Sequence, residues 1–283
     1  MTSFRAGYLE IEPRELVRYL LRNAGQFDRE YINPQELLEF LKLDYTSFHF
    51  ATELPEEARC TLAGASPRAL LSFADRLIAT DDSLSVKRER FSVLHEIGHY
   101  VLPHHEHALY VCDDIGLSFG TRLMLEKEAN DFAADLLFLG DRFSAEANSR
   151  QISTSTVKEL ATRYQSSFEA TARRLVEKNF RPCMLIVFKQ KNRQHNIDVD
   201  ATPSWDVRYC AASPIFKTRF FEKLRGEVPP EAVAAVTQSG KGIEDSYVCE
   251  ISVSDSATDK QTIFQAEFFF NTYNIFCLLT PKT

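Results

Sequence analysis

Residues 91–100 read FSVLHEIGHY and contain the pattern H-E-x-x-H. On a helix, positions i and i+4 lie on one face, so the imidazoles of His95 and His99 can reach one metal ion. Glu96 follows the first histidine, where its carboxylate can take a proton from a water bound to that metal. Zinc accepts imidazole nitrogen and lowers the pKa of bound water to about 7. The stretch therefore predicts a hydrolytic zinc site.

The same stretch has the periodicity of a helix. Apolar residues recur at spacings of three and four, at Phe91, Leu94, Ile97 and Val101. No proline interrupts this pattern before Pro103, so we expect a helix over about 86–102, with the histidines beside its buried stripe. The alternative is a structural helix with two incidental histidines, and the helical context favours the metal site.

Such a site needs a third protein ligand, and one candidate is His105, six residues after His99. One class of zinc peptidases uses this spacing in the pattern H-E-x-x-H-x-x-G-x-x-H. Here Leu102 stands in place of the glycine, which makes the turn back toward the metal difficult. We therefore expect a solvated, histidine-rich loop at 104–107.

The other candidate is a carboxylate from a second helix, predicted over 123–138 (LMLEKEANDFAADLLF). Its apolar residues share one face, namely Leu125, Ala129, Phe132, Ala133, Leu136 and Leu137. Glu126 and Glu128 lie near its start, and a glutamate would complete a His, His, Glu site with one position left for water. Asn130, one turn after Glu126, is placed to orient a ligand by a hydrogen bond. Helical periodicity alone does not single out either glutamate.

Composition limits the class of protein. The chain has 283 residues and a net charge of −7, which argues against a nucleic-acid binder acting by bulk attraction. Its six cysteines are widely spaced, the N-terminus has no apolar segment, and no apolar run approaches the length of a membrane span. We expect a cytoplasmic protein with buried free thiols and no membrane contact.

Before the helix expected over 86–102, we expect two helices within 13–43, the second capped by Asn33 with Pro34 in its first turn. An edge strand is expected within 44–52. Residues 69–79 fit either a helix or a strand.

Residues 150–193 carry ten Lys or Arg against three acids, a charge of +7, so the rest of the chain carries −14. Within them, residues 157–179 (VKELATRYQSSFEATARRLVEKN) resemble a helix-turn-helix. DNA binding through Arg163, Arg173 and Arg174 is one interpretation. We favour a helical module packed on the protein or docking an acidic partner.

From residue 182 onward, strand patterns predominate. The segments CMLIVFK, VCEISVSD and FQAEFFFNTYNIFCLLT indicate strands, and PIFKTRFFEKLRG indicates an amphipathic helix. A loop is expected at Ser239, Gly240 and Gly242. We expect Trp205 and the aromatic run 268–270 to belong to a core rather than to a ligand pocket.

The span RERFSVLHEIGHY followed by EKEANDFAADLL resembles the ImmA/IrrE family of zinc metallopeptidases. The resemblance implies zinc, with manganese as the alternative, held by His95, His99 and Glu126, with Glu96 as the catalytic base and Glu128 as the competing third ligand. Family members usually have a proline after the leucine pair, where this chain continues Phe138, Leu139, Gly140.

Together, the sequence patterns and the resemblance predict an α+β fold in three parts. These are a mostly helical zincin-like metallopeptidase domain (1–149), a helix-turn-helix-like module (150–181) and a C-terminal α+β domain (182–283) that would be a GAF-like sensor. The implied activity is site-specific cleavage of a cognate helix-turn-helix repressor, which would derepress stress, phage or mobile-element genes. The alternative is a DNA-binding regulator with a non-catalytic metal site. The oligomeric state stays open.

Overall fold

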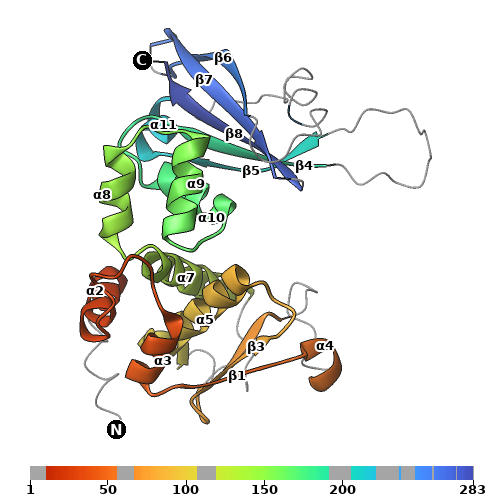
Figure 1. The fold of residues 1–283 in the computed structure, drawn as a ribbon. Coiled ribbons are helices and arrows are strands. Elements are labelled where there is room, and N and C mark those ends of the chain that lie inside the picture. Colours follow the sequence, from red (N-terminus) through yellow and green to blue (C-terminus); the bar gives the residue numbers. More distant parts are fainter. Residues whose placement is uncertain are drawn as a thin grey trace, which may run out of the picture. The chain divides into compact units, whose positions relative to one another are not determined.

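The computed structural model describes residues 11–55, 67–106, 119–190, 205–220, 236, 246–256, 258–271 and 273–282 (Figure 1). The chain divides into two compact units, residues 1–143 with 163–166, and residues 144–162 with 167–283. Helices and two separate sheets make up these units, so the predicted α+β class is confirmed.

The first unit begins with two helices, α2 (Pro13–Asn23) and α3 (Pro34–Leu41), as predicted. The Asn33 side chain accepts a hydrogen bond from the backbone N–H of Gln35, so it caps α3 with Pro34 in the first turn. Leucines on the inner faces of both helices are buried. The two helices are thus fixed by local capping and by a buried apolar stripe.

A three-stranded sheet follows, formed by β1 (Asp44–Phe48), β2 (Ala69–Ser72) and β3 (Leu77–Asp81), with the short helix α4 (Phe50–Glu53) after β1. The strand order is β1-β3-β2, with β1 parallel and β2 antiparallel to β3. The edge strand predicted within 44–52 is confirmed. The ambiguous segment 69–79 is a strand pair, and the positive φ of 56° at Arg76 lies in the connection.

Helices α5 (Val86–Val101) and α7 (Phe119–Leu137) pack side by side (Figure 1). Their approach depends on Gly98, where a Cβ atom would lie 3.2 Å from the carbonyl oxygen of Ala129. The helix predicted over 86–102 is confirmed. The second helix begins at residue 119, earlier than the predicted residue 123, so Gly120 is helical. Residues 107–118, which precede this helix, lie outside the described residues.

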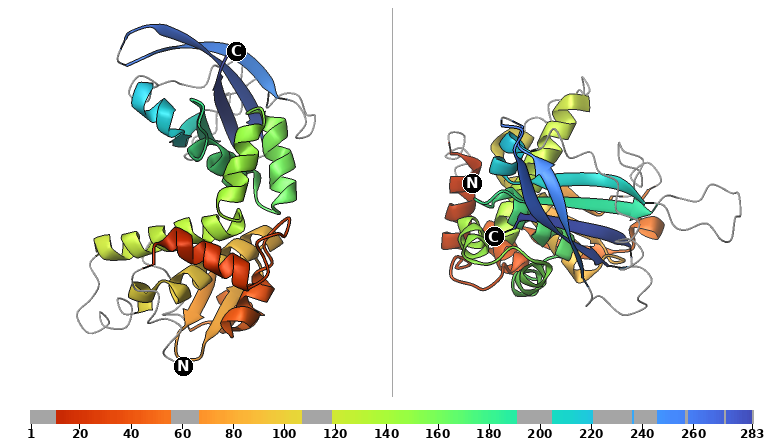
Figure 2. Two further views of the ribbon diagram at one scale, coloured as in Figure 1. Left: turned by 90° about the vertical axis from the view of Figure 1, so that its left-hand side faces the viewer. Right: turned by 90° about the horizontal axis from the view of Figure 1, so that it is seen from above.

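Three helices precede the second sheet, α8 (Asp141–Ser149), α9 (Thr154–Arg163) and α10 (Phe168–Glu177). Ser167 caps α10 by accepting a hydrogen bond from the Ala170 N–H. The ring of Phe168 contacts the rings of Phe269 and Phe276 in the sheet. The segment with helix-turn-helix character therefore forms two helices, and α10 packs on the sheet (Figure 2).

The second sheet is five-stranded and antiparallel, in the order β5-β4-β8-β7-β6. Its strands are β4 (Met184–Gln190), β5 (Trp205–Ala212), β6 (Tyr247–Ser254), β7 (Gln261–Phe270) and β8 (Asn274–Pro281). The predicted strands are confirmed. Helix α11 (Pro214–Arg219) covers the start of the predicted helix PIFKTRFFEKLRG, and 221–226 and the expected loop at Ser239, Gly240 and Gly242 lie outside the described residues.

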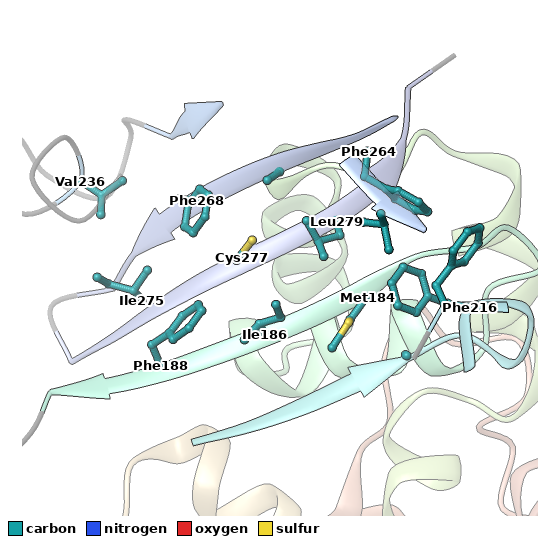
Figure 3. Packing of buried hydrophobic residues seen from close by; sticks show 14 residues of the cluster. Met184, Ile186, Phe188, Phe216, Val236, Phe264, Phe268, Ile275, Cys277 and Leu279 are labelled. Atoms are coloured by element: carbon teal, nitrogen blue, oxygen red, sulfur yellow. The ribbon is translucent and has the colours of Figure 1, made fainter. Parts of the chain in front are cut away.

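One face of this sheet carries the core of the second unit (Figure 3). Alternate residues of β4, β7 and β8 point to the same side there, including Met184, Ile186, Phe188, Phe264, Phe268 and Cys277. Trp205 and Phe270 are partly buried against this cluster, as expected of core rather than pocket residues.

The four cysteines in the described part of the chain form no disulfide. Cys183 and Cys277 are buried, as expected, but Cys210 is exposed. The expectation of buried thiols is wrong for Cys210, which lies on the edge strand β5, and Cys249 on the edge strand β6 is only partly buried. Cys60 and Cys112 lie outside the described residues. Among the described helices, none has the length and apolar character needed to cross a membrane.

Candidate metal centre

Three predicted ligands converge between α5 and α7. The Nε2 atoms of His95 and His99 lie 3.1 Å apart. The Glu126 carboxylate places Oε2 3.3 Å from His95 Nε2 and Oε1 3.6 Å from His99 Nε2. Two imidazole nitrogens and a carboxylate oxygen form a donor set that zinc accepts, so the residues present fit the metal implied by the family.

The local sequence explains this convergence. His95 and His99 are one helical turn apart, and the intervening Gly98 lets the backbone of α7 come close at Ala129. Glu126 lies three residues before Ala129, on the same side of α7. A side chain at position 98 would hold the two helices further apart and move Glu126 away from the histidines.

The electrostatics leave His99 neutral. Burial lowers the pKa of His99 to about 3, with a further lowering by the neighbouring His95. Burial also lowers the pKa of His95, but its hydrogen bond with Glu126, the charges of both nearby glutamates and a hydrogen bond with Asn130 together raise it above the ordinary value. The hydrogen bond with His95 lowers the pKa of Glu126. An ionised carboxylate beside a neutral imidazole suits a cation.

Glu96 is the remaining predicted catalytic residue. Burial raises the pKa of its carboxyl to about 7, and the negative charge of Glu126 adds to this rise while His95 opposes it. A base whose pKa lies near neutral pH can both accept and return a proton. A bound cation would lower this pKa, because it favours the ionised carboxylate.

His105 differs from its prediction. The sequence predicts a solvated, histidine-rich segment, but the His105 side chain is fully buried, with 0% exposure. Leu102 adopts an extended conformation (φ −74°, ψ 111°) and residues 103–106 are helical, so the chain turns back without a glycine. His105 Nδ1 then lies 2.9 Å from His99 Nδ1. His107 lies outside the described residues.

His105 and Glu128 nevertheless lie outside the His95, His99, Glu126 triad. His105 contacts Nδ1 of His99, whereas the triad forms at its Nε2. Glu128 Oε2 lies 3.1 Å from His105 Nε2 and 2.6 Å from His104 Nε2. The geometry thus places Glu126, not Glu128, against both histidines of the H-E-x-x-H pattern. Sequence reasoning misses the buried contact of His105 with His99, although the six-residue spacing points to it.

Comparison with known proteins bears on this site. Residues 55–176 match the IrrE N-terminal-like domain, Peptidase_M78. Over these residues the chain is similar to the IrrE N-terminal-like family. The IrrE-like region includes the triad and Glu96, and it extends into α10, so the resemblance to ImmA/IrrE peptidases is confirmed. No curated protein matches the chain.

The fold also has a solved counterpart. A Mycobacterium tuberculosis transcriptional regulator matches with a TM-score of 0.52 and 9% sequence identity, over 99% of this chain and 93% of that one. At this identity the likeness concerns the fold.

Proposed function

We propose that the protein is a zinc-dependent endopeptidase with a zincin-like catalytic domain. The observation that carries the proposal is the convergence of His95, His99 and Glu126 next to the carboxyl of Glu96. The triad would hold the metal and leave one position open. Bound there, zinc would polarise the scissile carbonyl and acidify the attacking water. Manganese is the alternative metal.

The chain's own groups supply the proton transfers. Glu96 accepts the proton of the attacking water and returns it to the leaving amine. His99 enters the reaction neutral, because burial holds its pKa at about 3. Glu126 brings a negative charge that offsets the cation. The packing of α5 on α7 at Gly98 fixes these groups before substrate binds.

We propose a cognate helix-turn-helix repressor as the substrate, cleaved at one site to derepress stress, phage or mobile-element genes. The match of residues 55–176 to the IrrE N-terminal-like domain supports this substrate class. The solved structure with the matching fold is a transcriptional regulator, which is consistent with a role in transcription. Such a peptidase would act in the cytoplasm. The C-terminal unit is the candidate sensor.

The alternative function, a DNA-binding regulator, is less well supported than the peptidase, because arginines of the basic helices are engaged within the protein. Arg174 is buried. Arg173 forms an ion pair with Glu177 on α10 and lies over the ring of Tyr209. Arginines held in this way are less available to phosphates. We therefore propose that α9 and α10 pack as a helical support for the sheet.

The test is incubation of the zinc-loaded protein with the helix-turn-helix regulator encoded nearest its gene, followed by mass determination of fragments. We expect one cleavage site, lost in Glu96→Gln with zinc retained. Lys127→Ala, on the exposed side of α7, is the matched control and should cleave at the wild-type rate. Cleavage by Glu96→Gln at the wild-type rate would refute the mechanism. Salt-sensitive DNA binding that Arg173→Glu abolishes, without proteolysis, would favour the alternative.

A further inference from the structure

A second group of metal-binding side chains lies beside the triad. His104 Nε2 and His105 Nε2 lie 2.6 Å and 3.1 Å from the same oxygen, Oε2 of Glu128. All three ligand atoms lie within 4.8 Å of one another. We call this group of His104, His105 and Glu128 the outer cluster. It shares no residue with the triad.

The outer cluster is chemically and sterically suited to a metal. It offers two imidazole nitrogens and one carboxylate oxygen, the same donor set as the triad. His104 and Glu128 are 51% and 40% exposed, so a cation can reach them from solvent. His105 is buried, which fixes one ligand in place. The ligands come from the turn at 103–106 and from α7.

Proton positions link the two groups. A neutral imidazole carries one N–H. When His99 offers the lone pair of Nε2 to a metal, its proton sits on Nδ1 and is donated to Nδ1 of His105, 2.9 Å away. The proton of His105 then sits on Nε2 and is donated to Glu128. This arrangement orients His99 for metal binding.

A metal on the outer cluster conflicts with this arrangement. It would need the lone pair of His105 Nε2, so the proton there must be released to solvent or reappear on Nδ1. On Nδ1 it would face the Nδ1–H of His99 across 2.9 Å, and the hydrogen bond would be lost. If the proton is released instead, His105 becomes an anion in a buried position, which is costly.

We propose that the outer cluster is a second, weaker zinc site and that its occupation lowers the affinity of the triad for zinc. By linkage, zinc at the triad weakens the outer site by the same factor. The binding of a second zinc ion does not depend on the proposed peptidase function.

The test is a zinc titration of the full-length protein by isothermal calorimetry, with bound metal counted by elemental analysis. We expect two equivalents, the second at least about tenfold weaker. His104→Ala should bind one equivalent with unchanged affinity at the triad, and Glu126→Ala should lose the tighter site. A wild-type protein that binds only one equivalent, or a His104→Ala variant that still binds two, would overturn the proposal.

The coupling is tested separately by competition with a chelator. Dissociation of the tight zinc ion should be faster in wild type at excess zinc than at one equivalent, and unaffected by excess zinc in His104→Ala. Lys127→Ala, on the same helix, should behave as wild type. Equal rates in wild type at both zinc levels would refute the coupling. These readouts need no substrate, so a failure to cleave the repressor would count against the proposed function alone.

Discussion

Replacing Glu96 with glutamine should stabilise the metal-free protein at neutral and alkaline pH. The folded-state pKa of Glu96 is about 7, against an ordinary value of 4.5. Between these values the unfolded chain has lost this proton and the folded chain keeps it, so stability falls as the pH rises through this window. The pKa of Glu96 thus differs by about 2.5 between the folded and unfolded chains. At about 1.36 kcal/mol for each pKa unit, this corresponds to about 3 kcal/mol in the free energy of unfolding.

Glutamine removes this penalty because it does not ionise. The gain in the free energy of unfolding should therefore be near zero at pH 4, and it should reach about 3 kcal/mol by pH 8. The assay is urea denaturation in the presence of a chelator, with wild type and variant compared at a series of pH values. Equal stability of the two proteins at pH 8 would refute the assignment of a raised pKa to Glu96.

Glu126→Gln is the matched control, because the sign of its effect is opposite. The hydrogen bond with His95 lowers the folded-state pKa of Glu126. Its charged form therefore contributes stability that is present above the unfolded-state pKa and is lost as the pH falls through the folded-state pKa. The variant should be less stable than wild type at pH 8, with the difference closing at acid pH. A stabilising effect at pH 8 would contradict the contact between Glu126 and His95.

Three further outcomes follow from the geometry. Gly98→Ala should destabilise the protein by about 1–2 kcal/mol, because a Cβ 3.2 Å from the Ala129 carbonyl oxygen outweighs the gain in helix propensity. The same variant should bind zinc more weakly when measured by calorimetry. A more stable variant with intact zinc affinity would contradict the close packing of the two helices. Ser167→Ala should cost about 1 kcal/mol in urea denaturation by removing the cap of α10, and a neutral effect would argue against that cap. Glu128→Gln should leave the affinity for the first zinc ion within about tenfold of wild type. Loss of that ion in this variant would show that Glu128, and not Glu126, is the third ligand.

The helices of the site could be predicted from the sequence, because their signals are local. The apolar spacing around the H-E-x-x-H pattern predicts α5, and alternation predicts the strands of the second sheet. The choice between Glu126 and Glu128 could not come from α7 alone. It depends on how α7 crosses α5, and that crossing is set by the contact between Gly98 and Ala129.

His105 illustrates a different limit of sequence reasoning. The prediction of a solvated His105 assumes that only a glycine at position 102 would let the chain turn back toward His99. An extended Leu102 followed by a new helical turn at 103–106 brings His105 back to His99 by another path. The start of α7 differs from its prediction for a similar reason, because Gly120 signals a loop locally but is helical in the structure.

One catalytic metal ion held by His95, His99 and Glu126 underlies the whole proposed chemistry. Anomalous diffraction at the zinc edge, from crystals of the protein loaded with one equivalent of zinc, would locate that ion directly. We predict one main peak about 2.0–2.2 Å from His95 Nε2, His99 Nε2 and a Glu126 oxygen. A main peak bound by His104, His105 and Glu128, with none at the triad, would show that the proposed catalytic site is wrong.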